Sequence, residues 1–270
     1  MFRFAPSPAN FALDEHNMVM YVVNNANILT SYKMYHQGAE QAPWEANLGQ
    51  CDQVLAITSR KKLVTASSNT LIFASFGEDG SLVKDAQIGT EHSTKIKFLA
   101  VSDDERLIFT GSALESEIKV HEMLTRDSLP DMKGHRAPIT CLFFRGGRLY
   151  SGSKDASIGV WTKELENECF LKTAGPTGQV TVSEDLSQLA YGLSSTDGKI
   201  RIMDLAEKKE LCFFEGHTAP PLQLKFILGG MKLVSSNYED GIMIWCIEGR
   251  AVVARFSGTY FATMQDDLYL

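Results

Sequence analysis

The chain alternates between short hydrophobic runs and short polar segments along almost its whole length. The runs are about six residues long and rich in Val, Ile, Leu, Phe and Tyr, and Gly, Asn, Asp and Ser separate them. Residues 96–102, 106–112 and 117–123 are typical, since each is strand-length and has turn residues on both sides. No stretch of 12 or more residues keeps the apolar stripe of an amphipathic helix without turn residues interrupting it. The pattern predicts an all-β fold.

The strand pattern repeats along the chain, which indicates a repeat architecture. Gly134–Trp161 and Gly216–Trp245 both open with Gly-His-x-Ala-Pro, contain two hydrophobic runs and a polar turn, and end a third run in Trp. His135 and His217 lie 82 residues apart, which is twice 41. Four strands in a repeat of this length match one blade of a β-propeller. The position of the two tryptophans is taken in the weaker copies by Tyr32, Ser75, His121 and Met203.

These features resemble the WD-repeat β-propeller family over almost the whole chain. In that family a His before the innermost strand, a Ser or Thr on the second strand, an acidic residue in the next turn and a Trp on the third strand form a hydrogen-bonded set. The resemblance implies one set of His135, Ser151, Asp155 and Trp161, and another of His217, Ser235, Glu239 and Trp245. Glu239 stands where Asp is usual, and the adjacent Asp240 is the alternative. His92 is a candidate member of a degraded set.

A His, a Ser and an Asp in one repeat are also the residue types of a hydrolytic triad. Because the set recurs two repeats later, we interpret both sets as internal supports of the blades and expect no catalytic residue and no enzyme. The alternative is a propeller-fold hydrolase that resembles glycosidases, whose blade signature is Ser-x-Asp-x-Gly-x-x-Trp. Ser153 and Asp155 begin that signature, but Ser157 replaces the Gly and Trp161 lies one residue too far along.

We predict one propeller domain over residues 1–270, with six recognisable blades and a partial seventh. The last segment is expected to form an inner strand, a turn and the start of a second strand. Two explanations remain open: a seventh blade continues beyond Leu270, or the ring closes at six with this segment against the first repeat. The expected repeats span about residues 9–50, 51–92, 93–135, 136–177, 178–217, 218–258 and 259–270.

Composition excludes several kinds of site. The net charge of −7 opposes nucleic-acid binding, which draws mainly on cationic side chains. Five cysteines without a CxxC pair, and histidines without HxxxH or HExxH spacing, suggest neither a disulfide framework nor a metal site. GxGxxG, GxxxxGK[ST] and GxSxG motifs are missing, so we expect no cofactor.

The chain also lacks an apolar stretch long enough to cross a membrane, so we expect no membrane insertion. Residues 1–6 do not resemble a secretory signal. We expect the protein in the cytoplasm, with the nucleus as the alternative.

A propeller displays its loops on a rigid body, and the family resemblance implies a scaffold that holds other proteins in a multiprotein complex. Arg136, Lys154 and Tyr238 are the candidate partner-binding residues, because they flank the implied His and acidic positions. Trp44 falls outside the repeated runs, and we expect it to cover the edge of its own blade. A subunit of an RNA-associated complex is a further alternative.

Overall fold

The fold is built almost entirely of short antiparallel strands. The computed structural model describes residues 10–14, 19–23, 29–35, 38–46, 53–57, 62–76, 82–195, 197–258, 262–264 and 267–269. Within these residues it has 26 β-strands and one turn of 3-10 helix, Leu228–Gly230. This confirms the predicted all-β fold class.

Six four-stranded sheets follow one another along the chain, and each uses four consecutive strands. The first sheet contains β1 (Asn10–Asp14), β2 (Val19–Val23), β3 (Leu29–Tyr35) and β4 (Gly38–Ala46), and the second β5 (Gln53–Ile57), β6 (Lys62–Ser67), β7 (Thr70–Phe76) and β8 (Leu82–Gly89). The third contains β9 (Ile96–Val101), β10 (Leu107–Ser112), β11 (Ile118–Glu122) and β12 (Ser128–Met132), and the fourth β13 (Ile139–Arg145), β14 (Arg148–Ser153), β15 (Ser157–Thr162) and β16 (Asn167–Lys172). The fifth contains β17 (Thr177–Val182), β18 (Gln188–Leu193), β19 (Ile200–Asp204) and β20 (Lys209–Phe214), and the sixth β21 (Gln223–Ile227), β22 (Lys232–Asn237), β23 (Gly241–Cys246) and β24 (Ala251–Phe256).

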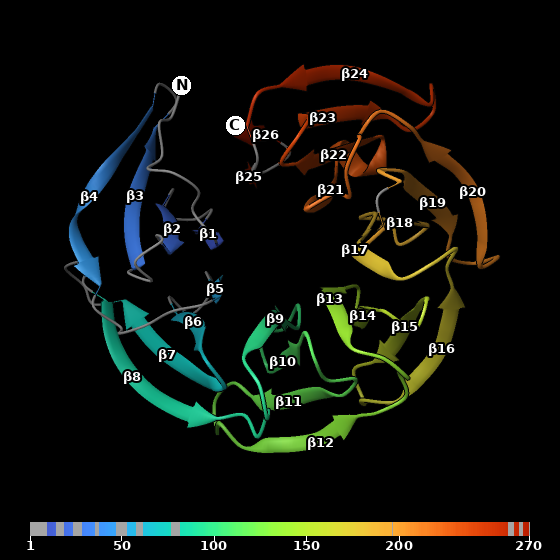
Figure 1. The fold of residues 1–270 in the computed structure, drawn as a ribbon. Helices are drawn as coiled ribbons and strands as arrows, with labels where there is room; N and C mark the ends of the chain where they lie inside the picture. The colour runs from blue at the N-terminus through green and yellow to red at the C-terminus, as the bar shows by residue number, and fades with distance from the viewer. Residues whose placement is uncertain are drawn as a thin grey trace.

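The sheets stand around a common centre as the blades of a propeller (Figure 1). The first strand of each sheet contacts the first strand of the next, from β1 through β5, β9, β13 and β17 to β21. A last hairpin, β25 (Ala262–Met264) with β26 (Asp267–Tyr269), lies in Figure 1 between the sixth sheet and the first. The arrangement is that of a WD-type β-propeller with six blades and a further hairpin.

The register between the third and fourth strands shifts at a recurring position in five of the six sheets. The shift falls just before Trp161 and Trp245, and just before the residues that stand in their place. In the second sheet it falls between Phe73 and Ala74. Ala74, not Ser75, is therefore the structural equivalent of Trp161. The sequence assigned Ser75 because no aromatic residue marks the position in that repeat.

Trp161 and Trp245 each hold their blade to the preceding one. Trp161 is 1% exposed and belongs to a buried cluster with Phe109, Val120 and Met132 of the third sheet. Trp245 occupies the same place between the sixth sheet and the fifth. Burial of large apolar side chains is the main favourable contribution to folding, so these contacts stabilise the interfaces between blades.

Candidate functional site: the histidine face of the propeller

The fourth blade contains the first of the hydrogen-bonded sets. His135 Nδ1 lies 2.9 Å from Asp155 Oδ2, and His135 Nε2 lies 2.7 Å from Ser151 Oγ. Trp161 Nε1 donates to the same Ser151 oxygen at 2.8 Å. Because a carboxylate only accepts, Nδ1 donates to Asp155, which leaves Nε2 to accept the Ser151 proton. The structure thus brings together all four residues of this set.

Asp155 also ties the loop before β13 to the turn after β14. It accepts the Arg136 backbone N–H at 2.9 Å and the Ser157 hydroxyl at 2.5 Å. Burial by itself raises the pKa of Asp155, but these hydrogen bonds and the one from His135 outweigh it and hold the pKa below its usual value. The carboxylate is therefore ionised and fully used inside the blade.

The sixth blade corrects one assignment made from the sequence. His217 Nε2 lies 2.6 Å from Ser235 Oγ, and Trp245 Nε1 donates to that oxygen at 2.7 Å. The carboxylate facing His217 Nδ1 belongs to Asp240, at 3.4 Å, and not to Glu239. Glu239 instead accepts the Thr218 hydroxyl at 3.0 Å. The turns 154–156 and 238–240 have the same length, but the left-handed backbone falls at Ala156 in the first and at Gly241 in the second, so a different position of the turn supplies the carboxylate.

Burial governs the protonation of His217. Its side chain is 0% exposed, and the distance to Asp240 exceeds that of an ordinary hydrogen bond. Burial lowers the pKa of His217 more than the Asp240 carboxylate raises it. Asp240 has its own donors, since it accepts the Thr218 backbone N–H at 2.6 Å and the Asn237 amide at 2.7 Å.

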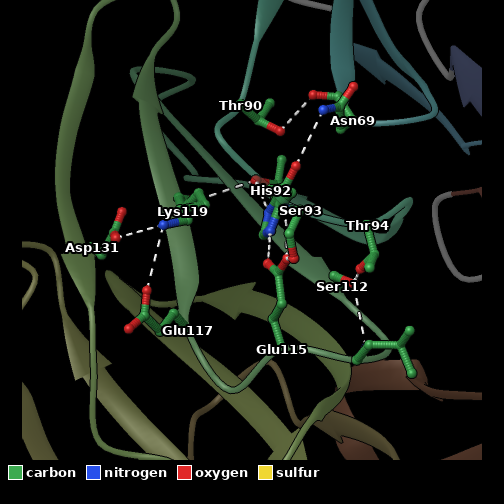
Figure 2. A network of polar contacts seen from close by, with 12 residues as sticks. Asn69, Thr90, His92, Ser93, Thr94, Ser112, Glu115, Glu117, Lys119 and Asp131 are labelled. Atoms are coloured by element: carbon green, nitrogen blue, oxygen red, sulfur yellow. Dashed lines mark hydrogen bonds and ion pairs between the residues drawn. The ribbon is translucent and has the colours of Figure 1, made fainter.

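The third blade carries a set that the sequence only partly indicated (Figure 2). His92 contacts Glu115 through Nδ1, and its Nε2 lies 3.0 Å from Thr110 Oγ1. Glu115 also accepts the backbone N–H of Ser93 at 2.7 Å. The loop His was a candidate, but Glu115 and Thr110 were missed. Their spacing of five residues matches that of Ser235 and Asp240, and this was the signal that could have found them.

A second histidine, His121, stands in the third blade where the fourth has Trp161. It pairs with Ile108, as Trp161 pairs with Leu149. Its Nε2 is buried without a hydrogen-bond partner among the described residues. Burial, and then the nearby charge of His92, lower the pKa of His121. This blade therefore keeps the His, hydroxyl and acid of the set but lacks the Trp donor.

The fifth blade replaces the set with an ion pair. Arg201 stands opposite Tyr191, as Gly159 stands opposite Ser151. Its Nη2 donates to Asp197 at 2.6 Å. The hydroxyl of Tyr191 donates to Glu210 at 2.8 Å, and burial together with Glu210 raises the Tyr191 pKa. This arrangement was not predicted, because the fifth repeat has no Gly-His pair to mark it.

The loops and turns held by these sets form one end of the sheets, which we call the histidine face. It consists of the loops 90–95, 133–138 and 215–222 and the turns 113–117, 154–156 and 238–240. Loop and turn are joined inside each blade by Ser93 and Glu115, by Arg136 and Asp155, and by Thr218 and Asp240. The face is thereby built from loops tied to the strands beneath them.

The sets offer no accessible nucleophile. Ser151 and Ser235 are both 0% exposed, and each hydroxyl oxygen already accepts a Trp N–H. A triad serine must reach a substrate carbonyl, and these two cannot do so without opening the blade. The geometry suits the internal support of loops.

The three candidate partner-binding residues all lie on the histidine face and are exposed. Arg136 is in the loop between β12 and β13, Lys154 is in the turn between β14 and β15, and Tyr238, 66% exposed, is in the turn between β22 and β23. Lys154 alone of the three lines a hollow of about 280 Å³ in this face. Trp44, expected in a loop, lies instead in β4, and its side chain is outside the described residues.

Two kinds of site are missing from the part of the chain that the structure describes. It holds no group of three or more His, Cys, Asp or Glu side chains that could bind a metal ion. It also has no helix long and apolar enough to cross a bilayer.

Comparison with known families addresses the blade that contains His135 and Trp161. The family described as "WD domain, G-beta repeat" matches residues 126–162, which run from the turn before β12, the last strand of the third blade, to the end of β15, the third strand of the fourth blade. The chain is a WD-repeat protein. The sixth blade repeats the His, Ser, acid and Trp landmarks, and the third and fifth blades have the same strand pairing with fewer of them.

Three relatives show how far the similarity extends. The chain is 29% identical over 180 residues to COMPASS component SWD3 of Saccharomyces cerevisiae, across 62% of this chain and 56% of that protein. It is 24% identical over 164 residues to pre-mRNA-processing factor 19 of Oryza sativa subsp. japonica, across 58% of this chain and 31% of that protein. It is 32% identical over 77 residues to the U3 snoRNP-associated protein-like EMB2271 of Arabidopsis thaliana, across 28% of this chain and 16% of that protein. The chain thus spans about half the length of the first relative and less of the others.

Proposed function

We propose that this WD-repeat protein is a non-catalytic subunit of a multiprotein complex and that its histidine face holds partner proteins. The observation that carries the proposal is the way three blades tie loop to turn through buried His and acidic residues. Binding residues on a rigid scaffold lose little conformational entropy when a partner docks. The relative named as a COMPASS component supports the role of complex subunit.

Arg136, Lys154 and Tyr238 are the proposed contact residues on this face. All three are exposed, and Arg and Tyr are residue types that anchor interfaces. The backbones of Arg136 and Lys154 are fixed by hydrogen bonds to Asp155 and to the Pro138 carbonyl, so their side chains project from ordered segments.

The test is an affinity purification from the native cell with an Arg136→Glu, Lys154→Glu double variant. We expect partner recovery to fall about tenfold or more, because each substitution places a repulsive charge at the interface. The matched control is a Lys163→Glu, Lys208→Glu double variant, which has the same charge change on exposed turns at the opposite end of the blades. Equal recovery with both variants would refute the histidine face as the docking surface.

A second candidate is a subunit of an RNA-processing complex. Two relatives are named as a pre-mRNA-processing factor and as a snoRNP-associated protein, and these names favour a nuclear location over a cytoplasmic one. The net charge of −7 argues against direct RNA contact, so the link would run through protein partners. We expect the recovery of partner proteins to be unchanged by nuclease treatment. Loss of the partners after nuclease treatment would contradict a link through proteins.

A further inference from the structure

The hollow beside Lys154 lies at the centre of the histidine face. Its walls come from the innermost strands β9, β13 and β17, the turns that follow β10, β14 and β18, and the segment before β21. Four consecutive blades therefore meet around it. Its volume of about 280 Å³ is near the lower limit of small-molecule pockets, which suits one side chain better than a cofactor.

The walls of the hollow are held in place by close packing. A Cβ on Gly192 would overlap Pro221, so the absence of a side chain at Gly192 lets Pro221 of the next blade pack directly on β18. Gly178 has a similar role, since a Cβ there would lie 3.2 Å from the Leu193 backbone. A rigid hollow binds its ligand without the entropic cost of ordering its walls.

The lining has one charge and no counter-charge. Among the described residues that line it, Lys154 is the only charged one, and the rest are apolar or neutral. Thr140 also lines it, but its hydroxyl oxygen is buried beneath the surface of the hollow. The complete lining is Phe98, Ala113, Ile139, Thr140, Lys154, Gly178, Gln179, Ser194, Pro220 and Pro221.

The structure shows no ion pair for Lys154 within the described residues, in contrast to the cations that pair within these blades. Lys119 pairs with Asp131 at 2.6 Å, Lys199 with Glu215 at 2.7 Å, and Arg201 with Asp197 at 2.6 Å. The carboxylates of the turns nearest to it are already used, Asp155 by its own blade and Glu115 by His92 and Ser93. Within the described residues, the hollow thus presents an ammonium group without a carboxylate partner beside a neutral wall.

We propose that this hollow binds an aspartate or glutamate side chain, carried on an otherwise apolar extended segment of a partner protein. This rests on the proposed function, since it names what the histidine face recognises. The carboxylate would accept from Lys154 Nζ, and the flanking apolar residues would cover Phe98, Ile139 and Pro221. A single cation is too few to hold a nucleic-acid backbone.

The test uses the whole chain and an array of immobilised nonapeptides with randomised Ala, Val, Leu and Pro around one central residue. The central residue is Asp, Glu, Asn, Gln or Lys. We expect the Asp and Glu pools to retain more protein than the Asn and Gln pools, and Lys154→Gln to lower that retention about fivefold, as for a partly exposed charge pair. Lys163→Gln, an exposed lysine on the opposite end of the same blade, is the matched control and should retain the preference.

A second variant tests the hollow without changing a charge. Ser194 lines it and is exposed, so Ser194→Trp should fill the space and abolish retention while thermal unfolding stays unchanged. Equal retention of acidic and amide pools, or loss of the preference with Lys163→Gln, would overturn the inference. If the acidic preference is missing while the Arg136→Glu, Lys154→Glu variant still loses native partners, only this inference fails and the proposed function stands.

Discussion

At the scale of single residues, two adjacent carboxylates in the turn after β22 have different surroundings. Asp240 accepts from the Thr218 backbone and the Asn237 amide and faces His217, whereas Glu239 accepts only from the Thr218 hydroxyl among the bonds described. Hydrogen bonds to charged groups contribute more than neutral ones. The two residues should therefore differ in their effect on stability, although the sequence alone made Glu239 the first choice.

Asp240→Asn should lower the free energy of unfolding by about 1–2 kcal/mol, because the amide cannot accept all the donors that the carboxylate serves. Glu239→Gln is the control, and its effect should stay within about 0.5 kcal/mol. Urea unfolding followed by Trp fluorescence measures both. If Glu239→Gln lowered the free energy of unfolding more than Asp240→Asn, Glu239 would be the acidic member of the set, as the motif implied.

Residue-scale prediction from the sequence succeeded where a rare residue type marked the position. Trp161 and Trp245, each preceded by a Gly-His pair, located their sets because both landmarks are uncommon and recur with the repeat. In the third blade His92 was a candidate, but its partners Glu115 and Thr110 were missed because His121 replaces the Trp there. The backbone conformation of the turn was not predictable either, since turns of equal length place the left-handed residue at Ala156 in one blade and at Gly241 in the other.

At the scale of the elements, the strand pattern was sufficient to predict the sheets. The bulges in the pairing of the third strand with the fourth were not predictable. A bulge changes register without a distinctive residue, and Ala74 offers no landmark to place it. The contact between the fifth and sixth blades is equally hidden from the sequence, because it depends on Gly192 having no side chain next to Pro221.

Gly192→Ala should lower the free energy of unfolding by about 1–3 kcal/mol, because the added methyl group overlaps Pro221 and forces the blades apart. Gly175→Ala is the matched control in the same blade, since its Cβ would lie 3.4 Å from Leu193, an ordinary contact. Differential scanning calorimetry of the two variants compares them directly. Equal melting temperatures would show that β18 and Pro221 separate without cost.

At the scale of the whole molecule, buried histidines link folding to pH. Burial lowers the pKa of His121 and of His217 below the ordinary value of 6.5. The unfolded chain therefore binds protons at these sites more readily than the folded chain does, and the stability they contribute is present above about pH 6.5 and lost as pH falls below it. The carboxylates of Asp155, Asp240 and Glu115 have lowered pKa values, so their contribution is lost only below about pH 4.

Stability should therefore decline in two stages on acidification, the first between about pH 7 and 5.5 with a slope of at most about 1.4 kcal/mol per pH unit for each histidine. Urea unfolding at a series of pH values measures the free energy of unfolding in each stage. A His217→Asn variant is less stable at neutral pH but should show a shallower first stage. Stability that stays level or rises from pH 7 to 5.5 would contradict the assignment of these two histidines.

The placement of Trp161 against the third sheet has a consequence for how damage spreads. Because the indole packs on Phe109 and Val120, its loss leaves a void whose walls belong mostly to the neighbouring blade. Amide protons of β10 and β11 should then exchange with solvent sooner than those of β19, which is one blade further along. A substitution that removes such a Trp from one blade thus destabilises the preceding blade first, because each blade stabilises the one before it in the chain.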